Sequence, residues 1–404
     1  MNHLRKFGPY IAIVLILCVM AAAMSGCLSA LLLTNREVND EPAESLSTED
    51  AEYVAKLEEI VALLDEVYID GYDTEELGDY LAEAAVAATG DRWSYYISAE
   101  DMAAYNEDKN NAYVGIGVTV VFNDGDEGIT ITDVTPGGPA DEAGLQIGDL
   151  IVAVEGENTA ALGMDETKNR IRGEEGTDVT ITIRRDGVEQ DVTITRATIA
   201  VQVVKYELLS SGDGYIKIAN FNENCARDTI AAIEDLMAQG AKGLIFDVRF
   251  NPGGYKVELV ELLDYILPEG PLFRSVDYTG AEEVDYSNAD CIDIPMAVLI
   301  NGDSYSAAEF FAVALQEYGV ATIVGTQTTG KANFQNTFVL SDGSAVAVSV
   351  GHYQTPNGVT LEGIGVTPDE IVEVDEETYY AIYYEELEKT EDLQLQTAIS
   401  TLSQ

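Results

Sequence analysis

Strand-like and helix-like segments alternate along the second half of the chain, and this alternation constrains the fold more than any other feature. Short apolar runs such as MAVLI are followed by longer amphipathic runs such as SAAEFFAVALQEYG. The alternating segments, all within residues 214–325, are GYIKIANF, DTIAAIEDLMAQG, GLIFDVRF, VELVELLDYIL, MAVLING, SAAEFFAVALQEYG and ATIVG. This pattern indicates an α/β layer fold with a largely parallel central sheet. The 404 residues, 47% of them hydrophobic, can form a large core and a second folded unit.

A β-rich module precedes this core or is inserted into it. Short β-rich runs separated by glycine turns fill residues 111–198, and one helix-like stretch, DETKNRIRG, interrupts them. Two helix-like runs come before the module, followed by a loop, GDRWSYYIS, that holds the single tryptophan. We therefore divide the chain into a leader (1–35), an acidic tether (36–51), an N-terminal helical region (52–110), the β-rich module (111–198) and the α/β core with its C-terminal segment (199–404).

The leader has the composition of a membrane segment. Arg5 and Lys6 precede an uncharged run over residues 7–35 that contains IAIVLILCVMAAAM. About 20 apolar residues span a bilayer, and a basic flank stays in the cytoplasm. We expect an uncleaved membrane anchor that places the rest of the chain on the extracytoplasmic side. Two rival interpretations stay open: a lipoprotein carrying lipid on Cys27, because MSGC resembles a lipoprotein cleavage box, and a cleaved signal peptide.

The net charge and the few cysteines limit which ligands the chain can bind. With 21 Lys+Arg against 72 Asp+Glu, the net charge of −51 repels phosphate backbones and makes nucleic-acid binding improbable. Outside the leader only Cys225 and Cys291 remain, without a CxxC motif or a Cys/His cluster, so neither a metal nor a cofactor is expected. Whether these two cysteines pair is left open.

Two glycine-rich stretches in the β-rich module carry a resemblance. VGIGV over 114–118 is followed by PGGPADEAGLQIGDLIVAVEG over 136–156. Together they resemble a PDZ domain, in which backbone N–H groups of Gly115, Ile116, Gly117 and Val118 would receive the terminal carboxylate of a peptide. Glycine suits this task because amides converge on an anion only where no Cβ intrudes. The peptide would then add to the module as an extra strand.

The remaining motifs resemble the C-terminal processing peptidases, also called tail-specific proteases. The matching segments are GYIKIANFNENC, KGLIFDVRFNPGG, MAVLINGDSYSAAEFFAVALQEYG, ATIVGTQTTGKANFQ, TPNGVTLEGIGVTPD and DLQLQTAISTL. The resemblance covers roughly residues 52–400. It implies a crotonase-like α/β core with an inserted PDZ domain, and a serine endopeptidase that cuts proteins near their C-terminal tails.

The same resemblance assigns roles to individual residues. The nucleophile falls on Ser306, the general base on Lys331 and a supporting glutamine on Gln335. The oxyanion hole would use the N–H of Ala307 and that of Gly253 or Gly254, and Ser304 is the neighbouring candidate for the nucleophile. The chemistry fits independently, because a serine at a helix start meets free N–H groups and a positive dipole end. A lysine acts as a base only where burial lowers its pKa.

Three other functions fit these residues less well. A Ser-His-Asp triad would need His352, since the other histidine, His3, lies in the leader. Gly330-Lys331 nearly completes a phosphate-binding loop, but Ala332 lacks the hydroxyl that magnesium requires and NTFVL predicts a strand instead of a helix. The third function is that of a catalytically silent PDZ-bearing scaffold.

Asp247 and Arg249 are expected to hold the NPGG turn by ion pairing.

Overall fold

The computed structural model describes residues 48–122, 125, 127–288 and 290–403. The expected membrane anchor and Cys27 lie outside these residues. Within the described ranges, no helix combines the length and apolar character needed to cross a bilayer. The chain forms two compact units, and the boundary between them falls between Thr89 and Gly90.

The described part of the N-terminal unit consists of two helices, as the sequence predicts. They are α2 (Thr48–Val67) and α3 (Thr74–Ala87). Asp73 caps α3, because its carboxylate accepts the N–H groups of Glu75 and Glu76 over 2.8 and 3.2 Å. No residue of α3 is buried.

A six-stranded sheet forms the centre of the second unit, in the order β10-β11-β12-β15-β16-β19. The strands β11 to β19 pair in parallel and β10 is antiparallel to β11, which confirms the predicted α/β fold. The strands are β10 (Val204–Leu208), β11 (Gly214–Ile218), β12 (Leu244–Asp247), β15 (Met296–Ile300), β16 (Ala321–Gly325) and β19 (Glu370–Ile371).

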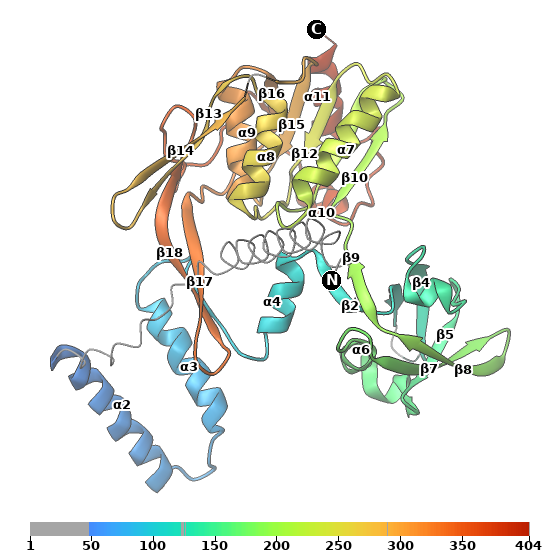
Figure 1. Cartoon of the computed structure of the whole chain (residues 1–404), viewed down its shortest axis with the longest axis vertical. Helices are drawn as coiled ribbons and strands as arrows, with labels where there is room; N and C mark the ends of the chain where they lie inside the picture. Colours follow the sequence, from blue (N-terminus) through green and yellow to red (C-terminus); the bar gives the residue numbers. More distant parts are fainter. Residues whose placement is uncertain (1–47, 123–124, 126, 289, 404) are drawn as a thin grey trace, which may run out of the picture. The chain divides into compact units, whose positions relative to one another are not determined.

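Helices cover both faces of this sheet (Figure 1). On one face α7 (Cys225–Ala238), α8 (Lys256–Ile266) and α9 (Ala307–Glu317) pack against alternate strand residues such as Phe246 and Val298. On the other face α11 (Leu393–Leu402) packs against the intervening residues, such as Ile245 and Leu299. Because both faces of the sheet are covered, the strand MAVLI is buried at every position. A strand buried on both faces has a continuous apolar sequence.

A second, antiparallel sheet in the same unit has the order β1-β18-β13-β14, and β17 also pairs with β18. Its strands are β1 (Tyr95–Ile97), β13 (Gly270–Asp277), β14 (Glu282–Ser287), β17 (Asn333–Val339) and β18 (Ala345–Gln354). The expected loop GDRWSYYIS therefore contains a strand, which forms because Ile97 is buried and pairs with Ala345. This strand and α4 (Met102–Lys109) belong to the same compact unit as the core, although the sequence grouped them with the N-terminal helices.

The β-rich module has a sheet of its own, in the order β3-β4-β5-β7-β8, and β6 pairs with β5. Buried isoleucines such as Ile131 and Ile181 form its separate core. The strands are β3 (Val118–Val121), β4 (Ile129–Val134), β5 (Leu150–Val154), β6 (Glu157–Asn158), β7 (Asp178–Arg185) and β8 (Val188–Thr195), and the helices are α5 (Pro139–Glu142) and α6 (Thr159–Ile171). The chain enters through β2 (Ala112–Gly115) and leaves through β9 (Ala197–Ala200), which pair with each other.

Candidate active site

Ser306 follows the carboxyl end of β15 and is the N-cap residue of α9. Its φ of 59° and ψ of −126° form a positive-φ conformation that costs on the order of 1–3 kcal/mol for a residue with a side chain. The neighbouring Tyr305 N–H donates to the carbonyl of Asn251 over 3.1 Å, and the N–H of Ser306 donates to Glu309 over 2.9 Å. These bonds hold the strained residue at a helix N-terminus, where developing negative charge is stabilised.

Ser304, the neighbouring candidate, is buried, and its hydroxyl is already hydrogen-bonded to the backbone. Its side chain is completely buried, and its hydroxyl donates to the carbonyl of Val248 over 2.7 Å. The same hydroxyl accepts the N–H of Asn301 over 3.0 Å. Ser306 is instead partly exposed. The geometry therefore favours Ser306 as the nucleophile and gives Ser304 a structural role.

Neither glycine of the NPGG turn has room for a side chain, and Gly253 lies against Ser306. A Cβ on Gly253 would lie 2.7 Å from the Cβ of Ser306 and 2.8 Å from the nitrogen of Ala307. One on Gly254 would lie 2.2 Å from the carbonyl carbon of Phe221. The N–H of Gly253 donates to Asn251 Oδ1 over 2.8 Å, whereas those of Gly254 and Ala307 have no acceptor among the described residues. Gly254 and Ala307 are thus the free donors of the predicted oxyanion hole.

The carboxylate of Glu309 connects the segments of the predicted nucleophile and the predicted base. One of its oxygens, Oε2, accepts the N–H groups of Ser306 and Lys331 over 2.9 and 2.8 Å. Two nitrogens that bind one oxygen at these distances lie less than about 6 Å apart. The structure therefore brings the segments of the predicted nucleophile and base together. The sequence motif Ser306-x-x-Glu309 indicates only a helix cap, and nothing in it signals the bond to Lys331.

The amine of Lys331 lies among aromatic rings. Its Nζ is 4.8 Å from the ring centroid of Trp93 and 5.7 Å from that of Tyr305, and the two rings stack at 6.1 Å. Among the residues that the structure describes, no carboxylate forms an ion pair with this amine. Burial and the charge of Lys109 lower the pKa of Lys331 to about 8, against the opposing effects of nearby carboxylates. Such an amine can release its proton near neutral pH.

Trp93 was not predicted as a site residue. Its indole N–H donates to Glu362 Oε1 over 3.2 Å, and the other oxygen of Glu362 accepts the N–H of Ala332 over 2.7 Å. Glu362 thereby ties the ring to the residue that follows Lys331. Trp93 precedes the base by a long stretch of sequence, so spacing could not signal the contact.

Gln335 is not bonded to the lysine amine in this structure. Its Nε2 donates to the carbonyl of Asn333 and to the hydroxyl of Ser349, both over 3.0 Å. A register shift between Phe334 and Gln335 places the glutamine opposite Ser349 on β18. Its expected support of Lys331 therefore stays a prediction.

Neither a histidine triad nor a phosphate-binding loop has matching geometry. His352 lies exposed on β18, and its Nδ1 shares a hydrogen bond of 2.7 Å with Asn333. Lys331 is followed by the strand β17, so the helix that a phosphate-binding loop requires does not begin there. Cys225 is buried and Cys291 exposed, and both are free thiols. Within the described ranges, no cluster of potential metal ligands is present.

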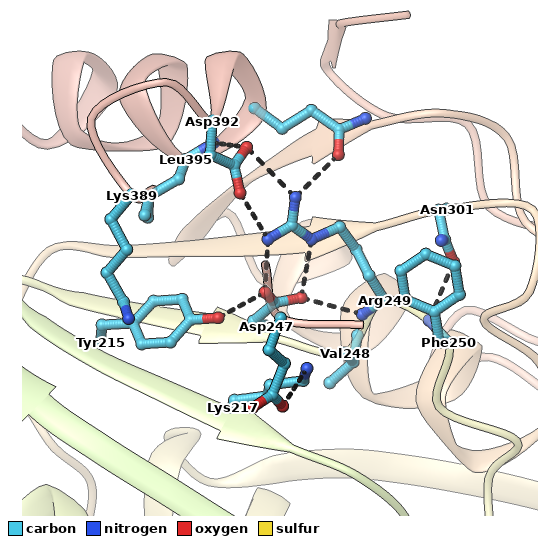
Figure 2. Close-up of polar contacts among 12 residues, drawn as sticks. Tyr215, Lys217, Asp247, Val248, Arg249, Phe250, Asn301, Lys389, Asp392 and Leu395 are labelled. Atoms are coloured by element: carbon cyan, nitrogen blue, oxygen red, sulfur yellow. Dashed lines mark hydrogen bonds and ion pairs between the residues drawn. The ribbon is translucent and has the colours of Figure 1, made fainter. Parts of the chain in front are cut away.

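A second cation, Arg249, is buried two residues before the NPGG turn (Figure 2). Its guanidinium donates to both oxygens of Asp247 over 2.9 and 2.6 Å and to Asp392 over 3.2 and 2.9 Å. Burial lowers the pKa of Arg249, but the two carboxylates more than offset this and raise it overall. Asp392 caps α11 by accepting the N–H of Leu395 over 3.0 Å. The expected ion pair is confirmed, and it extends to the C-terminal helix.

The predicted peptide site of the β-rich module lies at a free sheet edge. β3, which begins at Val118, pairs only with β4 among the described strands. Gly117 has φ 77°, and its carbonyl accepts the N–H of Thr135 over 3.0 Å. The carbonyl of Ile116 accepts the N–H of Ala140 over 2.8 Å, which fixes the turn from Gly115 to Val118. An open edge beside a fixed glycine turn can receive an added strand.

Comparison with known proteins identifies the class. Residues 213–372 match peptidase family S41, and residues 130–185 match the PDZ domain. The carboxyl-terminal-processing protease of Synechocystis sp. is 36% identical over 296 residues, which cover 72% of this chain and 68% of the relative. The carboxy-terminal processing protease CtpA of Bacillus subtilis is 30% identical over 381 residues, covering 94% and 79%.

The chain therefore belongs to peptidase family S41, and it is a serine protease with a PDZ domain. A crystal structure assigned to the S41 proteases, from Bacteroides fragilis, shares its fold with a TM-score of 0.50 and 19% identity. That match covers 83% of this chain and 92% of the other. The predicted fold class and family are thus confirmed.

Proposed function

We propose that this protease is an endopeptidase of the extracytoplasmic face, which cleaves proteins near their C-terminal tails by a serine–lysine mechanism. The observation that carries the proposal is the pair formed by Ser306 and Lys331. Their backbone nitrogens bind one carboxylate oxygen, and the lysine amine has a lowered pKa without an ion-pair partner in the described part of the chain.

The mechanism follows from these groups. The neutral amine of Lys331 takes the proton of the Ser306 hydroxyl while its oxygen attacks the substrate carbonyl carbon. The N–H groups of Ala307 and Gly254 stabilise the resulting oxyanion. The lysine ammonium then protonates the leaving amine. In the second half of the reaction, the neutral amine of Lys331 takes a proton from a water molecule that attacks the acyl carbon. Lys331 returns this proton to the Ser306 oxygen as the acyl group leaves.

Substitution of the nucleophile and the base tests the mechanism. Ser306→Ala and Lys331→Ala should each abolish cleavage of a disordered protein, with cleaved bonds mapped by mass spectrometry. Loss of a general base costs about 10²–10⁴ in rate, and more when nucleophile and base act as a unit. Lys331→Arg should be as damaging as alanine, because guanidinium does not deprotonate at working pH. Ser304→Ala, the matched control, should keep cleavage.

The outcomes separate the competing functions. Activity in Lys331→Arg, or loss only in Ser304→Ala, would overturn the serine–lysine assignment. A folded wild-type chain that binds C-terminal peptides but cleaves no protein would support a catalytically silent scaffold.

The PDZ domain is proposed to capture substrate C-termini at β3 and the turn over residues 115–118. A peptide ending in small apolar residues should bind, and its C-terminal amide should bind much more weakly, because the turn amides lose their anion. Equal affinity for acid and amide, measured by calorimetry, would contradict this role. The net charge of −51 also supports proteins over nucleic acids as partners.

The extracytoplasmic location rests on the leader sequence alone. Roughly 20 apolar residues within 7–33 suffice to span a bilayer, and Arg5 and Lys6 orient the segment. Mass spectrometry of the native chain should find the full N-terminus in the membrane fraction. Lipid on an N-terminal Cys27 would establish a lipoprotein, and a clipped, unlipidated chain would establish a cleaved signal peptide.

A further inference from the structure

The buried carboxylate of Glu309 connects the two reacting segments, and we propose that it is a positioning residue that sets the separation between nucleophile and base. The inference rests on the proposed serine–lysine mechanism and adds a third residue to it. Oε2 alone accepts the N–H groups of Ser306 and Lys331, so a shift of either segment must lengthen one of two bonds.

The second oxygen fixes the carboxylate itself. Oε1 accepts the N–H of Gly330 over 2.8 Å and the hydroxyl of Thr328 over 2.5 Å. The hydroxyl oxygen of Thr328 in turn accepts the N–H of Val366 over 2.6 Å, so its proton points to Glu309. Both carboxylate oxygens are thus held, and Oε2 cannot move freely when the substrate arrives.

The burial of Glu309 is greater than a helix cap needs. Its side chain is 0% exposed, and no Lys or Arg forms an ion pair with it among the residues described. An unpaired buried carboxylate is costly unless hydrogen bonds satisfy it. Burial raises the pKa of Glu309, and its four donors offset only part of that rise. A cap would require only the bond to Ser306, which a solvent-exposed glutamate can make.

Substitution by glutamine separates positioning from charge. The amide oxygen of Glu309→Gln can occupy the place of Oε2 and keep the bonds to Ser306 and Lys331. Its NH₂ group then faces Thr328, whose hydroxyl oxygen can accept, while the O–H of Thr328 and the N–H of Gly330 lose Oε1 as their acceptor. A positioning role therefore tolerates glutamine better than alanine, whereas a role that needs the negative charge does not.

The experiment compares three variants of the full chain in steady-state cleavage of a disordered protein. Glu309→Ala should lower kcat at least about 10²-fold with little change in KM, because the lost interaction holds catalytic groups and not substrate. Glu309→Gln should recover at least about tenfold of that loss. Ser287→Ala is the matched control: it removes a buried hydroxyl that donates to the carbonyls of Pro268 and Gly270 and touches neither reacting segment, so it should lower thermal stability and keep kcat within about threefold.

Several outcomes would contradict the positioning role of Glu309. If Glu309→Ala is as active as wild type per folded molecule, counted by circular dichroism, the positioning role is wrong. It is also wrong if Glu309→Gln is as slow as Glu309→Ala, or if Ser287→Ala loses as much kcat. When Glu309→Ala does not fold, Glu309→Gln decides: a kcat within about tenfold of that of Ser287→Ala supports positioning, and a loss of about 10²-fold or more contradicts it. Failure of the serine–lysine mechanism would appear separately, as activity retained in Ser306→Ala.

Discussion

Arg249 and Lys331 are cations of the same compact unit, yet the chain surrounds them in opposite ways. The side chain of Arg249 is 3% exposed and bonds to two carboxylates, Asp247 and Asp392. Lys331 lies against the rings of Trp93 and Tyr305 and has no ion pair in the described part of the chain. Carboxylates raise the pKa of Arg249, and burial lowers that of Lys331. The cation that fixes structure is ion-paired, whereas the cation proposed to lose its proton has no ion pair in the described part of the chain.

The largest effect on stability should come from removing the paired cation. Arg249→Met leaves Asp247 and Asp392 buried without their partner, and breaking a buried pair in this way costs about 3–5 kcal/mol. Urea unfolding followed by circular dichroism measures this free energy. Arg249→Lys is the matched control: it keeps the charge but loses the bidentate geometry, so its cost should be smaller. A loss below about 1 kcal/mol in Arg249→Met would show that the network contributes little.

Removing the unpaired cation, Lys331, should raise the free energy of unfolding instead of lowering it. At pH 7 Lys331 is charged in both folded and unfolded chains, and the folded chain bears the cost of a pKa lowered from 10.5 to about 8. Lys331→Met should therefore raise the free energy of unfolding by up to about 3 kcal/mol. Between about pH 8 and 10.5 the folded wild type loses its proton first and gains stability, so the advantage should disappear. An advantage equal at pH 7 and pH 10.5 would contradict this account.

The two cations also differ in what the sequence could predict. β/α alternation predicts the parallel sheet, and the family motifs predict Ser306 and Lys331, because both depend on neighbours in sequence. The surroundings of each cation come from far away. Arg249 bonds to Asp392 across 143 positions, and Trp93 bonds to Glu362 across 269. A single sequence carries no signal for pairings of this range, so the C-terminal contact of Arg249 and the ring beside Lys331 were missed.

Gln335 and Glu309 show the same limit at shorter range. The family resemblance implies that Gln335 supports Lys331, but in this structure a register shift between two strands turns the glutamine toward Ser349. Glu309 reads as a local helix cap, and its second function depends on where the loop before β17 folds back. Local patterns thus predict which residues are present at the site, whereas strand register and loop path decide which of them touch.

The pH dependence of cleavage should report on the surroundings of Lys331. We expect kcat/KM to rise through about pH 8, where the amine loses its proton. Trp93→Ala admits water to the amine, and Lys109→Met removes a nearby positive charge. Both should move this limb to higher pH, toward the ordinary lysine value. Asp91, Glu362 and Glu309 are the carboxylates that act in the opposite direction. If the rise in kcat/KM occurs at the same pH in both variants, it reports the titration of a group other than Lys331.

The smallest effect should come from a third arrangement, in which cations are paired at the surface. Glu385 accepts Lys205 Nζ over 2.7 Å and Lys217 Nζ over 2.6 Å, and these bonds lower the pKa of Glu385 to about 2. Because Glu385 is 45% exposed, solvent screens the pair, and Glu385→Gln should cost about 1 kcal/mol or less at pH 7. The contribution is present above about pH 4.5 and is lost as the pH falls toward about 2. Unfolding at low and at about 1 M salt tests this, because salt should weaken the Glu385 pair and leave the buried Arg249 network nearly unchanged. If both respond equally to salt, burial does not distinguish the two kinds of pair.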